Sequence, residues 1–252
     1  MKKIDSKPLY KDGRHYDMQH RNFKSDIPFY LDQARKYGDP ILELTCGTGR
    51  ITIPIAKEGY NIIGLDISDG MLKRAKENAK KELLKIELLK KDVRKFNLNK
   101  KFNLIIFPFN SIAHLHDLDS IESCFTEVKK HLTDDGRFVI DMFNPDLKRL
   151  IRNPKKRFPV AKYPDPNSKA TVVITESNIY DAAEQINYIT WHYKIGKKKF
   201  SYELNMRIYF PQELDELLIH NGFNIEAKYG SFKYSKFKPK SEKQIVVCGL
   251  KK

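Results

Sequence analysis

A short glycine-bearing turn between two apolar segments constrains the fold of this chain more than any other feature. Residues 41–44 form an apolar run that contains one acidic residue, Glu43, and the turn Thr45-Cys46-Gly47-Thr48-Gly49 follows at once, before apolar residues resume at Ile51. This order predicts a strand, a tight turn and a helix. The two glycines allow the backbone angles that such a turn needs and let a ligand approach the main chain. The turn is therefore predicted to cradle a ligand.

A second apolar segment, residues 60–66, ends in a carboxylate at Asp66. Its spacing from the glycine turn is that at which βαβ nucleotide sites present an acid to ribose hydroxyls. The third glycine of the dinucleotide fingerprint is replaced here by Thr52. The negative charge of Glu43, just before the turn, would repel a pyrophosphate and tolerate a cationic sulfonium. The pattern favours a methionine-derived adenosyl cofactor over a dinucleotide.

These residues resemble the first motif of the class I S-adenosylmethionine-dependent methyltransferases, in which an acidic residue precedes a Gly-x-Gly turn. The resemblance implies S-adenosylmethionine as cofactor and S-adenosylhomocysteine as product. It also implies that Asp66 holds the ribose, that Asp92 and Val93 flank the adenine, and that residues 108–111 lie beneath the methionine moiety. The predicted cofactor contacts are Tyr16, Glu43, Thr45, Cys46, Gly47, Thr48, Gly49, Asp66, Ile67, Met71, Asp92, Val93, Pro108, Phe109 and Asn110.

Three of these contacts have an alternative interpretation. Met71 is expected to cover the adenine, but methionine on a helix also serves plain core packing. Tyr16 is expected from the resemblance to touch the cofactor or the substrate, and it could instead only pack the N-terminal segment down. Cys46 is expected to contribute its backbone, because no neighbouring base would activate its thiol.

The remaining pattern predicts an α/β fold with a Rossmann-like, seven-stranded, mostly parallel sheet whose last strand is reversed. Beyond the first two strands, strands are expected at residues 86–92, 102–107, 137–141, 223–228 and 244–249, and helices at residues 26–37, 68–79, 121–132 and 210–220. Residues 102–107 suit the buried centre of a parallel sheet because their run is predominantly apolar. The ligand candidates from Gly47 to Asn110 follow the carboxyl ends of strands, where open α/β sheets bind ligands.

An antiparallel β insertion is predicted between the fifth strand and the last helix. Residues 171–179, 184–193 and 200–209 alternate between apolar and polar and are joined by turns, whereas residues 145–166 are basic and rich in proline. The insertion is expected to roof the site, and alternation turns half of its candidates outward. These candidates are Trp191, His192, Tyr193, Tyr202 and Arg207.

The predicted organisation is an N-terminal arm and helix at residues 1–38, the Rossmann-like domain at residues 39–144 and 208–252, and the lid at residues 145–207. The lid, with Phe210-Pro211-Gln212-Glu213-Leu214 after it, resembles small-molecule methyltransferases, including sugar N,N-dimethyltransferases.

Methyl transfer from a sulfonium is an in-line displacement, so the protein mainly positions the nucleophile and excludes water. His114 is the first candidate for a general base, because it follows the turn expected under the methyl group and histidine titrates near neutral pH. It could equally be a packing histidine. Tyr16 is the second catalytic candidate. Asn110, Asp141 and Asn144 could orient a substrate, and Asp141 could instead fix a loop.

The segment Phe107-Pro108-Phe109-Asn110 departs from the Asn/Asp/Ser-Pro-Pro-aromatic motif of many enzymes that methylate amines and nucleobases. This departure weighs against adenine N6 methylation. No Pro-Cys pair follows the fourth strand, so covalent cytosine C5 chemistry lacks its nucleophile. The predicted function is methyl transfer to an oxygen or nitrogen of a small molecule, with no metal. The acceptor and its reacting atom stay open.

Composition leaves two other functions open. The net charge of +15 suits an RNA methyltransferase, although many lysines are interleaved with glutamates as on a solvated helix. A non-catalytic cofactor-binding module is the other alternative, because methyl transfer demands no obligatory base. Three scattered cysteines and the lack of a membrane-length apolar run predict a cytoplasmic protein without membrane contact. The oligomeric state is not predicted.

Overall fold

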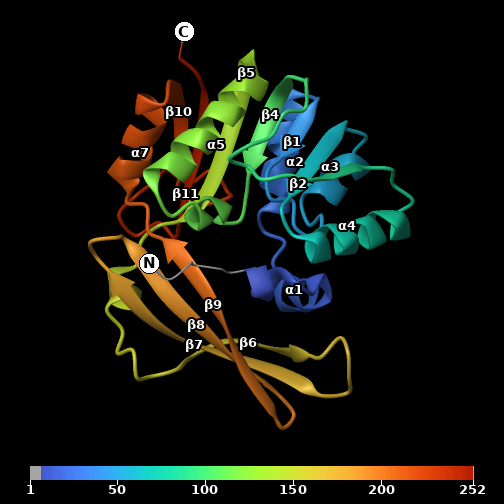
Figure 1. The fold of residues 1–252 in the computed structure, drawn as a ribbon. Coiled ribbons are helices and arrows are strands. Elements are labelled where there is room, and N and C mark those ends of the chain that lie inside the picture. The colour runs from blue at the N-terminus through green and yellow to red at the C-terminus, as the bar shows by residue number, and fades with distance from the viewer. Residues whose placement is uncertain (1–6, 252) are drawn as a thin grey trace.

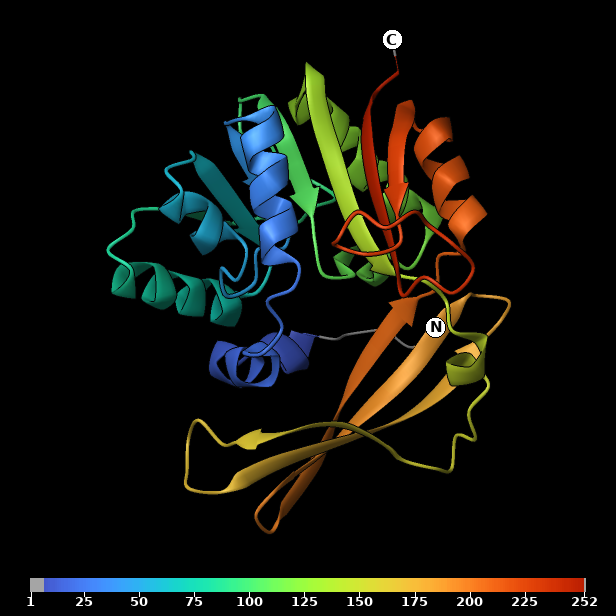
Figure 2. The same cartoon turned by 180° about the vertical axis from the view of Figure 1, so that it is seen from behind.

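The computed structural model describes residues 7–251, which form a seven-stranded sheet flanked by helices and a separate four-stranded sheet (Figures 1 and 2). The strands of the large sheet are β1 Ile41–Glu43, β2 Ile62–Asp66, β3 Glu87–Lys90, β4 Phe102–Phe107, β5 Leu132–Phe143, β10 Phe223–Tyr229 and β11 Lys243–Leu250. The helices are α1 Gly13–His20, α2 Ile27–Tyr37, α3 Thr52–Lys57, α4 Asp69–Lys81, α5 Leu118–His131, α6 Leu147–Leu150 and α7 Pro211–His220, with 3₁₀ helices η1 Lys7–Tyr10 and η2 Ser111–His114.

The large sheet has the strand order β10-β11-β5-β4-β1-β2-β3. Strands β1 to β5 pair in parallel, and β11 runs antiparallel to both β5 and β10. The order turns at β1 and β4, where the connections leave in opposite directions, and open α/β sheets bind ligands at such a point. The predicted fold class, including the reversed last strand, is confirmed.

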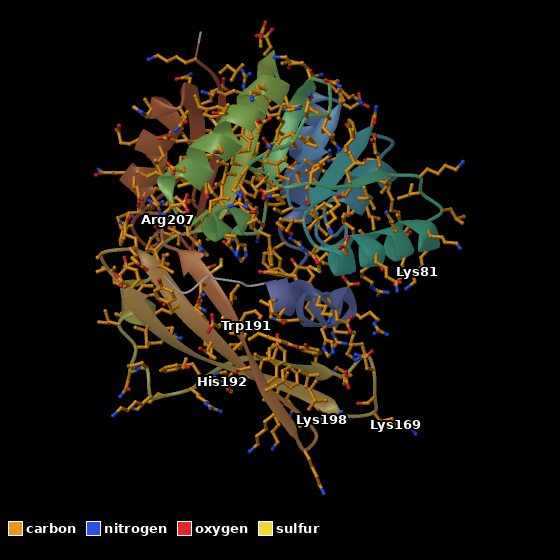
Figure 3. The ribbon with its side chains drawn as sticks, viewed as in Figure 1. Lys81, Lys169, Trp191, His192, Lys198 and Arg207 are labelled. Atoms are coloured by element: carbon orange, nitrogen blue, oxygen red, sulfur yellow. The ribbon has the colours of Figure 1, made fainter. Side chains whose placement is uncertain are left out.

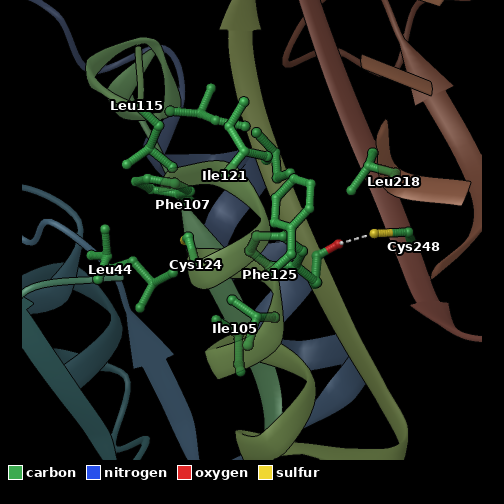
Figure 4. Packing of buried hydrophobic residues seen from close by; sticks show 14 of the residues in the cluster. Leu44, Ile105, Phe107, Leu115, Ile121, Cys124, Phe125, Leu218 and Cys248 are labelled. Atoms are coloured by element: carbon green, nitrogen blue, oxygen red, sulfur yellow. Dashed lines mark hydrogen bonds between the residues drawn. The ribbon is translucent and has the colours of Figure 1, made fainter. Parts of the chain in front are cut away.

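Alternation along β4 divides the core into two layers. Ile105 and Phe107 pack against α5 in one cluster, while Leu104 and Ile106 pack toward α2 and α3 in the other. Figure 4 shows the first layer, where Phe125 of α5 lies among the strand side chains. Phe102 and residues 104–107 are almost fully buried, as expected for the centre of a sheet covered on both faces.

Polar side chains cap the N-termini of helices α4 and α5. The Ser68 hydroxyl accepts a hydrogen bond from the Met71 backbone N–H at the start of α4, and Asp117 accepts one from Ser120 N–H at the start of α5. Such caps satisfy N–H groups that have no partner inside the helix. Because α4 starts directly after β2, its cap fixes the chain beside the carboxylate of Asp66.

The structure differs from the sequence prediction in three places. Strand β5 begins at Leu132, but its pairing with β4 skips from Leu132 to Arg137, so residues 133–136 bulge out where a turn was expected. Strand β6, Phe158–Pro164, lies in the stretch for which no period was found. The N-terminal arm contains α1, which carries mostly polar residues and showed no sustained pattern.

The predicted antiparallel insertion is the four-stranded sheet β6-β7-β8-β9. Its other strands are β7 Thr171–Asp181, β8 Ile186–Ile195 and β9 Lys198–Arg207. Helix α1 lies between this sheet and the carboxyl ends of the large sheet (Figures 1 and 2). Within residues 7–251, no helix has the length and apolar character needed to cross a membrane.

Candidate active site

One cavity of about 1980 Å³ lies between the carboxyl ends of the large sheet, α1 and the four-stranded sheet. Pockets for one drug-sized ligand hold about 300–1,000 Å³, so this space can take a cofactor and an acceptor together. Its wall includes eleven of the predicted site residues, namely Tyr16, Thr45, Gly47, Asp66, Ile67, Met71, Asp92, Val93, Phe109, Asn110 and His114.

The tips of β1 and β2 meet at a hydrogen bond between the glycine turn and the acid. Gly47 adopts φ +57° and donates its N–H to Asp66 Oδ2 at 2.8 Å, while Ser68 N–H donates to Asp66 Oδ1 at 2.8 Å. Burial raises the pKa of Asp66, and these backbone N–H groups oppose the rise. A carboxylate can accept about four hydrogen bonds. Asp66, which lines the cavity, therefore retains acceptor capacity for a ligand hydroxyl.

The glycine turn leaves a space that a side chain would fill. A Cβ built on Gly47 would meet no atom nearer than Met71 Cε at 3.6 Å. Met71 is buried and also lines the cavity, so its side chain faces the turn across this space. The residues present therefore fit a ligand that lies against the main chain, with Met71 at its side.

Five predicted contacts lie behind the cavity wall rather than in it. Glu43 accepts a hydrogen bond from the Thr52 hydroxyl and is 2% exposed. Cys46 packs with Leu72, Ala75 and Leu88, and burial raises the pKa of its thiol. The others are Thr48, whose carbonyl accepts from Asn78, Gly49, which abuts Ile53, and Pro108, whose carbonyl accepts from Ser111 N–H.

The position of Glu43 changes the electrostatic interpretation of the sequence. Burial raises the pKa of Glu43 to about 8, although the Thr52 hydroxyl bonds to the carboxylate and lowers it in part. At neutral pH the side chain is then mostly protonated in the structure, because its charged form is poorly solvated. Burial thus opposes the full negative charge on Glu43 on which the preference for a sulfonium was based.

Asp92 and Val93, which follow strand β3, also border the cavity. Arg94 Nη2 donates to Asp92 Oδ2 at 2.6 Å, and Arg94 N–H donates to Asp92 Oδ1 at 2.9 Å. These bonds hold the carboxylate in one orientation. Ile67 is 46% exposed on the same side and offers apolar surface to a ring system.

The tips of β4 and β5 form a strained turn without glycine. Phe109 and Asn110 have φ of 61° and 60°, a conformation that costs non-glycine residues about 1–3 kcal/mol each. Asp141 Oδ2 accepts from Phe109 N–H at 2.6 Å and from the Tyr30 hydroxyl at 2.7 Å. Lys243 Nζ donates to Asp141 Oδ1 and to Asn110 Oδ1, each at 2.8 Å. Tertiary bonds thus hold the turn.

Of the two roles foreseen for Asp141, the structure has it fix a loop, since the residue is fully buried and does not line the cavity. Tyr30 and Lys243 were missed by sequence reasoning. Tyr30 looked like one apolar residue of a helix face, and Lys243 belongs to a lysine-rich tail in which no local signal distinguishes it. Asn144, the other candidate, donates its side-chain amide to the carbonyls of Ser241 and Pro239.

His114 borders the cavity and bonds to a residue that sequence reasoning also missed. The Tyr10 hydroxyl and His114 Nε2 lie 2.9 Å apart. Burial lowers the pKa of His114 to about 4, so the imidazole is neutral at pH 7 and a weaker base than the ordinary histidine that was expected. The arrangement suits His114 to hydrogen bonding more than to proton removal.

An aromatic cluster joins α1 to the turn after β4. Tyr16, His20 and Phe109 form mutual ring contacts, with centroids of His20 and Phe109 5.0 Å apart. Arg50 lies 4.7 Å above the Phe109 ring and forms a two-pronged ion pair with the fully buried Asp26, at 2.7 and 2.6 Å. Sequence reasoning missed Arg50, which follows the glycine turn directly.

The N-terminal segment is hydrogen-bonded both to the start of α4 and to the four-stranded sheet. Its Asp17 accepts from Arg74 Nε of α4 at 2.6 Å, and Ser68 Oγ donates to the carbonyl of Tyr10 at 2.8 Å. On the other side His15 Nδ1 lies 3.2 Å from the hydroxyl of Tyr163 on β6. Residues 7–20 therefore close one side of the cavity.

The register of the four-stranded sheet decides which roof candidates face the cavity. Trp191 and Tyr193 line it, together with Met206 of β9. His192 lies between the two aromatics on the opposite face and bonds to Ser177 at 2.9 Å (Figure 3). Tyr202 and Arg207 do not line the cavity, and Arg207 pairs with Glu213 at 2.9 Å. Residues 7–251 contain no cluster of three or more side chains that could hold a metal ion.

Comparison with known proteins gives consistent matches. Residues 41–136 match the family model described as Methyltransferase domain. A putative methyltransferase of Geobacillus sp. is 26% identical over 118 residues, which are 45% of this chain and 48% of the relative. The chain thus spans about half the length of that relative.

Two solved structures share the fold over nearly the whole chain. An S-adenosylmethionine-dependent methyltransferase from Clostridium acetobutylicum has a TM-score of 0.76 and 24% identity, covering 95% of this chain and 97% of that one. The sugar N-methyltransferase KedS8 from Streptoalloteichus sp. has a TM-score of 0.72 and 17% identity, covering 95% and 92%.

Proposed function

We propose that this chain, a class I S-adenosylmethionine-dependent methyltransferase, transfers the methyl group to an oxygen or nitrogen of a small-molecule acceptor. The observation that carries the proposal is that Gly47 and Asp66 border the same cavity as the aromatic roof residues Trp191 and Tyr193. A cofactor against the glycine turn would leave the roofed part of the cavity for the acceptor. S-Adenosylmethionine supplies the electrophilic methyl group when bound.

The proposed cofactor contacts follow from donors and acceptors already in place. Asp66 accepts from the ribose hydroxyls, and Asp92 accepts from the exocyclic amine of the adenine. Met71 and Ile67 supply apolar surface to the ring. Glu43, Cys46, Thr48, Gly49 and Pro108 support the cavity wall from behind and make no direct contact with the cofactor.

The proposed acceptor compartment lies between the turn after β4 and the four-stranded sheet. Trp191, Tyr193 and Met206 give it an apolar roof, which excludes water around the reacting atoms and places a small acceptor in line with the sulfonium. Tyr16 packs α1 against the turn. His114 is neutral and orients the acceptor through its bond with Tyr10, and the acceptor proton leaves to solvent.

The basic excess does not by itself favour RNA as the acceptor. Lys197, Lys198 and Lys199 are exposed at the hairpin between β8 and β9 and do not line the cavity. Figure 3 shows Lys198 at this hairpin. An apolar roof over the cavity, formed by Trp191, Tyr193 and Met206, suits a small molecule better than a polymer. The sugar N-methyltransferase that shares the fold is consistent with this size of acceptor, without identifying it.

The test is transfer of radiolabelled methyl groups from S-adenosylmethionine to a metabolite extract by the full chain. We expect label in small products, and far less label with Asp66→Asn when S-adenosylmethionine is well below saturation. Label in added total RNA, with retention on RNA that weakens steeply as salt rises, would support RNA methylation instead. Tight binding of S-adenosylhomocysteine without transfer to any acceptor would indicate a non-catalytic cofactor-binding module.

A further inference from the structure

The ammonium of Lys243 fixes the orientation of the Asn110 amide. Lys243 Nζ lies 2.8 Å from Asn110 Oδ1 and 2.8 Å from Asp141 Oδ1, and its side chain is 16% exposed. An ammonium group only donates hydrogen bonds. The atom of Asn110 that faces it must therefore be the carbonyl oxygen, since the amide NH₂ would place donor against donor.

This orientation leaves the NH₂ group of Asn110 as the free polar end of a side chain in the cavity wall. Within residues 7–251, Nδ2 of Asn110 has no hydrogen-bond partner. The backbone that carries this side chain is itself held in place, because Asn110 N–H donates to the carbonyl of Asp141 at 3.1 Å and Phe109 N–H donates to the Asp141 carboxylate. The cavity wall thus presents a hydrogen-bond donor at the turn after β4.

Resting on the proposed function, we infer that Asn110 donates a hydrogen bond to the acceptor atom and that the enzyme methylates oxygen: a hydroxyl, a phenol or a carboxylate. A donor stabilises the anionic form of such an oxygen and lowers its pKa. An amine nitrogen cannot accept a hydrogen bond from Asn110 during the reaction, because its single lone pair must attack the methyl group. Its N–H groups need acceptors, and Lys243 occupies the oxygen of Asn110.

The step balances as a simple displacement. A phenol or a carboxylic acid loses its proton to solvent before it binds, whereas a hydroxyl keeps its proton until attack and releases it to water as the product forms. In each case a lone pair of the acceptor oxygen forms the O–CH₃ bond. The S–CH₃ bond breaks, its electron pair stays on sulfur, and neutral S-adenosylhomocysteine leaves. Asn110 is a catalytic residue in this scheme because it touches the reacting oxygen, and Lys243 is a positioning residue that acts through it.

Two variants separate the donor from the shape of the turn. Asn110→Asp keeps the size of the side chain and adds an ion pair with Lys243, so the turn persists while the cavity loses its donor. Lys243→Met removes the ammonium and frees the amide to rotate, and Lys243→Arg restores a group that only donates. Lys233→Met, an exposed lysine of the same tail, is the control.

The experiment uses the full chain, radiolabelled S-adenosylmethionine and a metabolite extract, with mass spectrometry to place the methyl group in the labelled product. We expect an ether or ester. With that product's precursor, Asn110→Asp should lower kcat about 100-fold or more, as loss of one such donor does. Lys243→Met should lower kcat about tenfold, and Lys243→Arg should restore part of that loss. Lys233→Met should leave kcat unchanged.

Calorimetry with S-adenosylhomocysteine, which carries no sulfonium, checks that cofactor affinity stays within about threefold in Asn110→Asp, and thermal unfolding checks the fold. A methyl group on nitrogen overturns the inference and leaves the proposed function intact. So does an Asn110→Asp variant whose loss lies in cofactor affinity rather than kcat, since Asn110 then contacts the cofactor. Absence of any labelled product overturns the proposed function, and the inference with it.

Discussion

Two turns border the cavity, one after β1 and one after β4, and they reach similar backbone conformations by different means. At the tips of β1 and β2, the left-handed residue that meets Asp66 is Gly47, which adopts φ +57° without a steric cost. At the tips of β4 and β5 the left-handed residues are Phe109 and Asn110, held by a carboxylate, an ammonium and a phenol from other elements. The first turn is encoded in part by its own glycines, although Thr45 there also has φ 57°, whereas the second turn has no glycine and is held by tertiary contacts.

This difference teaches where mutation should disturb stability and where it should disturb binding. A locally encoded turn keeps its shape when a ligand-binding side chain is changed. A turn held by distant groups loses its shape when any of those groups is changed. The following variants test that division.

The largest effect is expected from Glu43→Gln, which removes a buried acid beneath the tip of β1. The pKa of Glu43 is about 8 in the folded chain and near 4.5 in the unfolded one, so between these values only the unfolded chain is ionised. Stability should then fall as pH rises through this window, and the cost is complete above the folded pKa.

Urea denaturation at pH 5 and pH 8 measures this effect. The wild type should lose about 4 kcal/mol more than the variant between the two pH values, since each pKa unit corresponds to about 1.4 kcal/mol. If the free energy of unfolding changes equally between the two pH values in both proteins, Glu43 is ionised in the folded chain. The preference for a cationic sulfonium inferred from the sequence would then stand.

Asp141→Asn should disturb stability most at the tips of β4 and β5. It leaves the ammonium of Lys243 without its carboxylate and weakens the hydrogen bonds that Asp141 Oδ2 accepts from Phe109 N–H of the turn and from the Tyr30 hydroxyl, so we expect a loss of about 3 kcal/mol in the free energy of unfolding. Denaturation by urea measures this, with the exposed Asp134→Asn as control. A loss below about 1 kcal/mol would mean that the turn holds its shape without Asp141.

Asp66→Asn should weaken cofactor binding strongly and change stability little, the opposite of Asp141→Asn. The Kd for S-adenosylhomocysteine should rise about 100-fold, because charge-assisted hydrogen bonds contribute about 1.5–3 kcal/mol each, while the free energy of unfolding falls by only about 1 kcal/mol. Calorimetry and urea denaturation on one preparation decide it. Affinity equal to that of Asp134→Asn would remove Asp66 from the cofactor site.

The smallest effect is expected from Gly47→Ala, compared with Gly59→Ala. Both glycines have positive φ, and a Cβ on either meets no atom within 3.4 Å, so both variants should lose about 1 kcal/mol of stability. Only Gly47→Ala should also weaken the binding of S-adenosylhomocysteine, by about tenfold, because the methyl group of the alanine occupies the space against the glycine turn. Matching affinities in the two variants would contradict a ligand lying against the turn.

Sequence reasoning succeeded where a conformation or a layer depends on neighbouring residues. The glycine turn, Asp66 at the end of β2 and the apolar strand β4 were all predicted, and the structure places Gly47 and Asp66 in hydrogen-bond contact. The β-rich insertion was predicted from its alternation, but which residues face the cavity was not, because a register shift of one residue inverts the faces.

The rest of the site could not be read from local pattern. Lys243 and Asn110 are brought together by the pairing of β11 with β5, and Tyr10 reaches His114 only because η1 packs over the cavity. The bend after β4 contains no residue that prefers the left-handed region except Asn110. Such contacts depend on the tertiary structure, so one sequence without its fold does not show them.

The bond between Ser68 and the Tyr10 carbonyl has a consequence for the pace of turnover. It secures the chain's first segment next to the acid of β2, and Arg74 and Tyr163 secure the same segment from two directions. A spent nucleoside cannot leave past this segment until those links open. If the by-product leaves on this side of the cavity, we expect its departure, rather than the displacement at sulfur, to limit the turnover rate.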